Sequence, residues 1–158
     1  MAMNTDQVFE LEFGRTDACL SEKEKKAMIS IKQSREAVYT FQGKLQTVDK
    51  YKRFWLCEIE KGGPTAKELI RKIPRKTQTF CSPFRLDQQT NQLMMVLNGK
   101  DLEPWSDEIR QQMQGCELIF TIKLTAFVDF NGYSGISASV TNVSSEDHQS
   151  MSEFPVDA

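Results

Sequence analysis

Histidine is nearly missing from this chain of 158 residues, because its single histidine, His148, stands in a polar stretch near the C-terminus. A serine or cysteine nucleophile elsewhere in the chain therefore has no imidazole to serve as its base. The sequence also lacks a G-x-x-x-x-G-K-[ST] phosphate loop and a G-x-S-x-G nucleophile elbow. These absences argue against an enzyme, and we expect neither catalytic residues nor a cofactor.

Paired carboxylates do occur, as in Glu58 with Glu60 and Asp107 with Glu108. A metal-dependent nuclease uses such groups to hold divalent ions. Neighbouring acidic residues are far more often ordinary surface. The nuclease hypothesis therefore stays a third alternative, which predicts cleavage that depends on a divalent ion.

Cysteine is scarce and scattered. The four cysteines are Cys19, Cys57, Cys81 and Cys116, and no two of them form a C-x-x-C pair. A zinc site with so few cysteines would also need histidines, and His148 is far from all four in the sequence. We predict buried, free thiols and no metal site.

Long apolar runs are missing too, since none approaches the roughly 18 consecutive residues that a membrane-spanning helix needs. Residues 1–6 lack the charged-then-apolar pattern of a signal peptide. The hydrophobic content of 39% is still enough for the core of one domain. We expect a cytoplasmic protein with one domain at 1–143, including an N-terminal extension at 1–36, and a tail at 144–158.

Charge is distributed unevenly along the chain, although the net charge is only −2. Residues 23–85 carry 16 Lys and Arg against 6 Asp and Glu, whereas residues 86–158 carry 3 against 11. Residues 1–22 are acidic as well. Lys and Arg release counterions from phosphates and acidic groups repel phosphates, so this pattern favours a polyanion binder with a detachable acidic segment. Ordinary solvated surface is the alternative.

Alternating apolar and polar residues predict several strands. Residues 37–48 and 54–60 form one predicted hairpin. Residues 77–86 and 92–97 are two further predicted strands, and Pro83 places the first of them at a sheet edge.

Helices are predicted only as short segments. The T-x-x-E pattern at 65–68 is a capping box that opens a helix over 65–73, and Pro74 ends it. A second helix is expected within 101–114, with a glycine at its end.

The N-terminal segment is predicted less uniformly. Residues 8–13 alternate and predict a short strand, whereas residues 20–31, rich in Lys and Glu, suit either a helix or a mobile arm. Phe9 and Phe13 in this segment could cover one face of the sheet that the rest of the chain forms.

The clearest strand comes late in the chain, at residues 118–130, where every even position is apolar. An Asn-Gly pair follows, and then a second strand at 133–143. A two-residue loop would turn Ile136 and Val140 to the polar side of the hairpin.

A three-residue loop avoids this conflict, because it pairs Val128 with Ile136 and Ala126 with Ala138. We predict that register. Five or six such strands with one or two short helices suit a mainly β protein with an OB-like barrel.

Binding chemistry is better supplied than catalytic chemistry. Single-stranded nucleic acid is held by a positive groove that follows its backbone and by aromatic rings on which bases stack. Aromatic residues are interleaved with cations at 50–55 and again at 71–85. The predicted nucleic-acid-binding residues are Lys44, Lys50, Tyr51, Lys52, Arg53, Phe54, Arg71, Lys72, Arg75, Lys76, Phe80, Phe84, Arg85, Lys123 and Phe127.

Two aromatic residues of this region have different predicted roles. Trp55 shares its side of the strand with Cys57 and Ile59, which makes it a core candidate. Tyr51 lies in a segment too polar to be buried, so it is either a stacking residue or an idle exposed tyrosine.

Phe127 is the most informative candidate, because alternation puts it on the polar side of its strand with Lys123. The predicted register places Ser137 opposite Phe127, and Ser137 is too small to cover a phenyl ring. A large ring on a face of small residues beside a lysine suits base stacking. The alternative is that the N-terminal segment covers this face.

The acidic end of the chain, residues 144–158, has no packing pattern and is predicted to be disordered. It can compete with nucleic acid for a basic groove, or present Glu153, Phe154 and Asp157 to a partner protein. An inert solubilising terminus is the alternative.

The basic middle, the final hairpin and the acidic end together resemble the OB-fold single-stranded DNA-binding proteins of bacteriophages. The most specific part is FVDFNGYSGIS at 127–137, which looks like the closing hairpin of that group, and the resemblance covers roughly 37–143. It implies coating of exposed strands during replication or recombination in the host cytoplasm, with the tail recruiting replication enzymes. The tail departs from the Asp-Phe ending common in the group, because Phe154 stands four residues inside.

A second class of function is a protein–protein interaction module, such as a phage-encoded inhibitor or an assembly subunit. The two classes differ in salt dependence, because affinity for DNA or RNA falls steeply as salt rises. Either class is compatible with a homo-oligomer.

Overall fold

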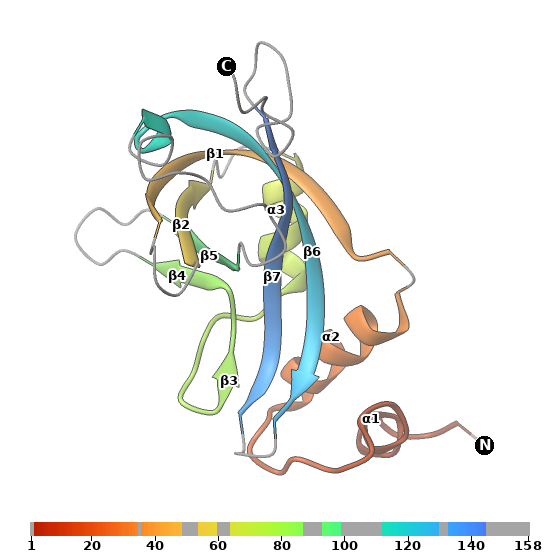
Figure 1. Ribbon diagram of the computed structural model, residues 1–158. Coiled ribbons are helices and arrows are strands. Elements are labelled where there is room, and N and C mark those ends of the chain that lie inside the picture. Colours follow the sequence, from red (N-terminus) through yellow and green to blue (C-terminus); the bar gives the residue numbers. More distant parts are fainter. Residues whose placement is uncertain are drawn as a thin grey trace.

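The computed structural model describes residues 2–34, 36–48, 54–59, 64–86, 93–98, 112–129 and 133–144 (Figure 1). Within these residues the chain is mainly β, as predicted, with a few short helices. The helices are α1 (Thr5–Phe13), α2 (Glu22–Gln33) and α3 (Pro64–Lys72). The strands are β1 (Val38–Val48), β2 (Phe54–Ile59), β3 (Phe80–Cys81), β4 (Phe84–Leu86), β5 (Leu93–Asn98), β6 (Glu117–Val128) and β7 (Ser134–Ser144).

These strands form one sheet in the order β3-β7-β6-β1-β2-β5-β4. Antiparallel pairing joins β1 to β2 and β6, β2 to β5, and β6 to β7. The sheet curls until β5 meets β7 at one parallel bridge, Asn98 to Ser139. The strands β1, β2, β5, β7 and β6 therefore form a circuit of pairings, and the sheet has the shape of a half-barrel (Figure 1).

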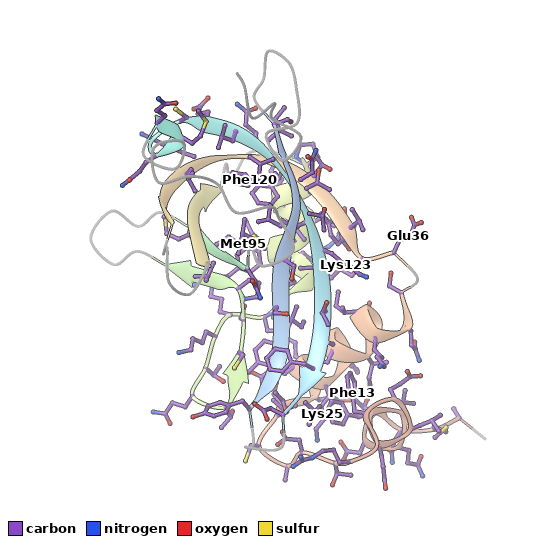
Figure 2. The ribbon with its side chains drawn as sticks, in the orientation of Figure 1. Phe13, Lys25, Glu36, Met95, Phe120 and Lys123 are labelled. Atoms are coloured by element: carbon purple, nitrogen blue, oxygen red, sulfur yellow. The ribbon has the colours of Figure 1, made fainter. Side chains whose placement is uncertain are left out.

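The core lies inside this curl, because one side of each long strand is apolar. On β6, Leu118, Phe120, Ile122 and Leu124 are all buried. Phe120 stacks on Phe41 of β1 with ring centroids 5.6 Å apart, and Figure 2 shows Phe120 within the curl. Burial of such side chains is the main favourable contribution to folding.

Most of the predicted elements are confirmed. The predicted strands at 37–48, 54–60 and 92–97 correspond to β1, β2 and β5. The helix predicted over 65–73 is α3, which buries Leu69, and Ile73 directly after the helix is buried too. The segment 77–86 is divided into β3 and β4, which stand at the two ends of the strand order, so the prediction of an edge is also confirmed.

The predicted register of the final hairpin is wrong by two residues. Val128 pairs with Ser134 and Ala126 with Ile136, and the amide of Asp129 donates to the carbonyl of Tyr133 at 2.7 Å. A shift by two residues keeps every apolar side chain on the inner face. Alternation therefore predicts correctly which face is buried. It cannot distinguish two registers that differ by an even number of residues, because both bury the same face.

The strand predicted at 8–13 is wrong, since these residues belong to α1. The Asn4 side chain accepts from the Gln7 amide at 2.8 Å while the Gln7 side chain accepts from the Asn4 amide at 2.9 Å, which is a capping box. Gly14 ends the helix with a φ of 76°. Phe9 and Phe13 are one helical turn apart, and their ring centroids lie 4.6 Å from each other.

Residues 20–31, for which two structures were considered, fall mainly in α2. Ser21 and Glu24 form its capping box, and Met28 and Ile31 are buried against the core. Figure 1 shows α1 and α2 together beside the ends of β6 and β7 that form the hairpin tip. We call α1 and α2 the helical pair.

Three of the four cysteines are given by the structure as free, as predicted, but they are less buried than predicted. Cys19 is exposed, and Cys81 and Cys116 are partly exposed. Cys19 lies in the turn between the two helices, where its amide donates to Asp17 at 3.0 Å, so it has no apolar strand around it.

Two predictions concern residues outside the described ranges. The helix expected within 101–114 is described only at its end, where residues 112–113 are helical. The tail at 144–158 is described only at Ser144, the last residue of β7. No helix in the described part of the chain is long and apolar enough to span a membrane.

Candidate nucleic-acid interface

The β1–β6–β7 part of the sheet has a polar side turned away from the core. Thr40 of β1 and Thr121 of β6 pair across the strands, and their hydroxyls lie 3.2 Å apart. Thr125 of β6 stands opposite Ser137 of β7, and Lys123 stands opposite Ser139. We call this surface the polar outer face, which consists of Val38, Thr40, Gln42, Lys44, Glu117, Ile119, Thr121, Lys123, Thr125, Phe127, Gly135, Ser137 and Ser139.

Phe127 supplies an aromatic ring to this face, which also carries the apolar Val38 and Ile119. Its neighbours in sequence, Ala126 and Val128, pack against the core, so strand geometry directs Phe127 the other way. The corrected register places Gly135 opposite Phe127. The ring is partly buried, yet the residue across the strand has no side chain with which to cover it.

The sequence left open whether Phe9 and Phe13 cover the face of the sheet that carries Phe127. In the structure both rings pack at the core. Phe9 is 1% exposed and belongs to the core, and Phe13 packs against that same core. Ala126 and Val128 lie at the margin of this core, on the side of β6 opposite to Phe127. The helical pair therefore extends the hydrophobic core at the inner face of β6.

Gly135 is also the point where β3 approaches β7. An added Cβ at Gly135 would lie 2.1 Å from the carbonyl oxygen of Cys81, a distance that no side chain allows. The backbone of Cys81 in β3 therefore lies over the outer face at Gly135, directly across from Phe127, and Gly135 is buried.

The predicted cations that the structure describes are largely exposed. Lys44 and Lys123 are exposed on the polar outer face, and Figure 2 shows Lys123 beside β6. Arg71, Arg75 and Lys76 are exposed on α3 and on the segment after it. Among the described residues, both ion pairs lie in the helical pair and none involves these five cations.

Lys72 differs from the other predicted cations because it is half-buried. Its Nζ donates to the Tyr39 hydroxyl at 2.9 Å and lies 5.7 Å from the centroid of that ring. This contact ties α3 to β1. Lys72 therefore has a structural role in addition to its charge.

The prediction that Phe80 and Phe84 stack on bases is wrong. Phe80 is 1% exposed and Phe84 is 3% exposed. Phe80 pairs β3 with β7, and Phe84 pairs β4 with β5 next to the buried Met95. Both rings fill the core at the edges of the sheet and are not accessible to a base.

Several predicted residues cannot be placed by their side chains. Phe54 and Arg85 lie on β2 and β4, where only their backbone pairing is described, with Asn98 and Met94 respectively. Trp55, the core candidate, pairs with Leu97. The remaining predicted residues lie outside the described ranges: Lys50, Tyr51, Lys52, Arg53, Glu153, Phe154 and Asp157.

Two surface residues near the hairpin tip were missed at the level of sequence. Tyr133 is 59% exposed, and Arg15 donates from Nη1 to the carbonyl oxygen of Asp129 at 3.4 Å. An aromatic residue directly after Asn-Gly, and a lone arginine within an acidic segment, were the available signals.

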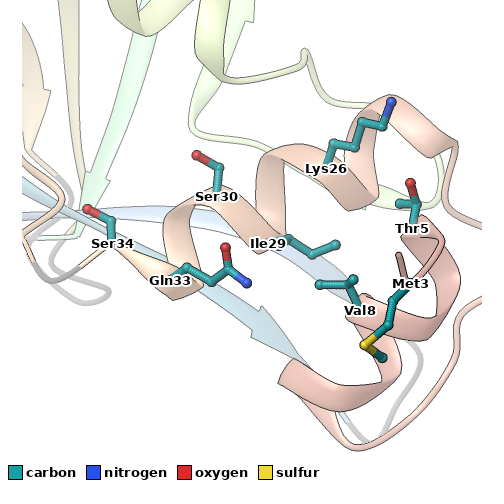
Figure 3. Close-up of a pocket in the computed structure, with 8 residues that line it drawn as sticks. All are labelled: Met3, Thr5, Val8, Lys26, Ile29, Ser30, Gln33 and Ser34. Atoms are coloured by element: carbon teal, nitrogen blue, oxygen red, sulfur yellow. The ribbon is translucent and has the colours of Figure 1, made fainter. Parts of the chain in front are cut away.

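The helical pair carries an open groove of about 480 Å³ between its two helices (Figure 3). Met3, Val8 and Ile29 supply its apolar lining, and Lys26 lies at its border. None of the predicted nucleic-acid-binding residues lines this groove.

Comparison with known proteins gives no match to a family model, a curated protein or a solved structure. Within the described ranges no three His, Cys, Asp or Glu side chains gather in a way that could hold a metal ion. The polar outer face and the exposed cations are therefore the features of the described chain that bear on function.

Proposed function

We propose that this chain is a sequence-tolerant single-stranded DNA-binding protein that coats exposed strands during replication or recombination, and that it is not an enzyme. The observation that carries the proposal is the exposed Lys123, which has no ion pair within the described residues and shares the outer face of β6 and β7 with the Phe127 ring, Gly135 and Ser137. Phosphates are bound by Lys44, Arg71, Arg75, Lys76 and Lys123, and a base stacks on Phe127.

The strand circuit supports an OB-type barrel. An OB-fold is a five-stranded Greek-key barrel whose oligonucleotide-binding surface includes the loops after its first and fourth strands. In the circuit described above, β1, β2, β5, β6 and β7 take the places of the five strands. The segment between its first and second strands is then residues 49–53, which is basic and contains Lys50 and Tyr51.

Sequence tolerance follows from the type of contact. Phosphate contacts and stacking on a ring do not read the hydrogen-bonding edge of a base. The hydroxyls of Thr125, Ser137 and Ser139 add neutral donors for phosphate oxygens beside Lys123. RNA offers the same phosphates and rings, and competition between the two nucleic acids measures the preference.

The acidic end of the chain acts as a competitor for these cations and presents Glu153, Phe154 and Asp157 to replication or recombination proteins. Residues 145–158 carry four Asp and Glu and no Lys or Arg. Truncation after Ser144 keeps every described strand, and it should tighten DNA binding at low salt. Unchanged affinity after this truncation would remove the competitor role.

The test of the proposal is fluorescence anisotropy of a labelled poly-dT oligonucleotide, titrated with the full chain at low and moderate salt. Binding should weaken as salt rises, with a log-log slope of about −0.7 for each phosphate contact on a single strand. Duplex DNA should compete poorly. No binding of the oligonucleotide at low salt, with or without the tail, would show the proposal to be wrong, and cleavage that appears only with Mg²⁺ would favour a nuclease.

The groove of the helical pair favours one other function, a protein–protein interaction module. Apolar grooves between helices accept apolar side chains of partner peptides. A complex held there would depend on Val8 and Ile29 and would be much less sensitive to salt than a complex with DNA.

A further inference from the structure

The closed end of the β6–β7 hairpin carries a second aromatic ring on the polar outer face. The hydrogen bond from the Asp129 amide to the Tyr133 carbonyl continues the ladder beyond Phe127 and Gly135. Opposite residues in an antiparallel pair share a face, so Tyr133 lies on the same face as Gly135 and Phe127. Diagonal neighbours on such a face are about 7–8 Å apart, which places two rings within reach of one bound strand.

Tyr133 is the more accessible of these two rings. It is 59% exposed, whereas Phe127 is partly buried. Buried tyrosines are usually held by hydrogen bonds and packing, and this exposure leaves a face of the ring open to a ligand.

The segment between the two helices holds this end of the hairpin in place. The Ser134 hydroxyl is fully buried and donates to Oδ2 of Asp17 at 2.9 Å. The other oxygen of Asp17 accepts from the Cys19 amide at 3.0 Å. Through Asp17, the hairpin tip is fixed to the turn that leads into α2.

Arg15 lies in the same segment and meets the hairpin tip. One nitrogen, Nη1, donates to the Asp129 carbonyl at 3.4 Å. In the part of the chain that the structure describes, no carboxylate lies within ion-pair distance of Arg15. A guanidinium has five N–H donors in a fork that matches a phosphate, so Arg15 keeps donors for an anion beside Tyr133.

From this arrangement we infer a further nucleotide-binding site, in which Tyr133 stacks on one base of the strand and Arg15 binds a neighbouring phosphate. Asp17 and Ser134 are positioning residues for it. The inference rests on the proposed single-stranded DNA binding and extends it from the sheet to the N-terminal extension.

The experiment compares Tyr133→Ala, Tyr133→Phe and Arg15→Ala with the unaltered chain by anisotropy with the same poly-dT oligonucleotide. Tyr133→Ala should weaken binding about fivefold or more, the usual effect of losing one stacked base, and Tyr133→Phe should restore most of the affinity. Arg15→Ala should also weaken binding and reduce the magnitude of the salt slope by about 0.7.

Matched controls come from the helical pair. Leu11→Ala removes an exposed apolar side chain from α1, and Lys32→Ala removes an exposed cation from the end of α2. Both should leave the affinity unchanged. Photo-crosslinking with an oligonucleotide that contains 5-iodouridine should place adducts at Tyr133.

The outcomes separate this inference from the function on which it rests. If the unaltered chain binds and Tyr133→Ala binds equally well, the site is absent while DNA binding stands. If Leu11→Ala weakens binding as much as Tyr133→Ala, the effect is unspecific and the site is likewise rejected. If the unaltered chain does not bind at all, both proposals fall.

Discussion

The helical pair and the curled sheet use their charged side chains in opposite ways. In the helical pair, Lys25 is 11% exposed at its side chain and lies 2.8 Å from a carboxylate oxygen of Asp6, and Lys26 pairs with Glu22 at 3.4 Å. On the sheet, Lys44 and Lys123 are exposed, and within the described ranges neither has such a partner. Lys25 therefore joins the two helices, whereas Lys44 and Lys123 stay available for a ligand.

This difference matters for function because pairing changes what a cation can do. A cation that is already paired must lose its partner before it can bind a phosphate, whereas an unpaired one loses only water and counterions. The segment around Arg15 belongs to the N-terminal extension by sequence but resembles the sheet in this respect. In the N-terminal extension, the change from a paired cation to an unpaired one therefore occurs in the turn after α1.

The largest expected effect contrasts the two faces of β6. Phe120→Ala should lower the free energy of unfolding by about 3–5 kcal/mol, because it removes a fully buried ring that stacks on Phe41. Phe127→Ala on the same strand should cost about 1 kcal/mol or less, and should weaken binding of poly-dT about fivefold.

Urea denaturation of Phe120→Ala and Phe127→Ala measures the two losses of stability. Anisotropy measures the loss of poly-dT affinity. A loss of several kcal/mol for Phe127→Ala would mean that the ring serves the core and that the polar outer face is not a platform for bases. Phe127→Tyr is the matched control, since it keeps a ring for stacking.

An intermediate effect is expected where the helical pair meets the sheet. Ser134→Ala should destabilise the protein by about 1.5 kcal/mol, because it removes a buried hydrogen bond to a charged group. Asp17→Asn keeps an acceptor oxygen for Ser134 and should cost less.

Thermal denaturation followed by circular dichroism orders these two variants. Equal stability of Ser134→Ala and the unaltered chain would show that the hairpin tip is not fixed by the turn after α1, and it would remove the argument for a preorganised Arg15.

Sequence reasoning performed best where one side of an element is buried and the other is wet. Alternation predicts β1, β6 and β7 because their inner residues enter the core and their outer residues are Thr, Ser and Lys. Pro74 predicted the end of α3 for an equally local reason, whereas the helix begins at Pro64, one residue before the threonine predicted to cap it. In these elements a single physical preference determines the structure.

The wrong predictions concern residues whose burial or secondary structure depends on contacts that the local sequence pattern does not reveal. Phe80 and Phe84 stand on strands of two and three residues, which are too short for alternation to reveal which side is buried. In α1, Phe9 and Phe13 alternate like a strand and also have the i, i+4 spacing of a helix face, and the capping box of Asn4 decided between the two. Tyr133 was passed over because a loop residue has no periodic pattern from which exposure can be judged.

The smallest expected effect tests the comparison itself. Asp6→Asn should lower the free energy of unfolding by about 1 kcal/mol, because it leaves the largely buried Lys25 ammonium without its carboxylate while Asp6 itself is 68% exposed. Lys123→Met should change stability by less than about 0.5 kcal/mol but should reduce the magnitude of the salt slope for poly-dT by about 0.7.

Urea denaturation at two salt concentrations measures the stability of both variants, and anisotropy measures their affinity for poly-dT. Asp6→Asn should leave DNA binding unchanged. If Lys123→Met destabilises the protein as much as Asp6→Asn and leaves the salt slope unaltered, then the sheet uses its cations for stability as the helical pair does, and Lys123 is not a phosphate contact.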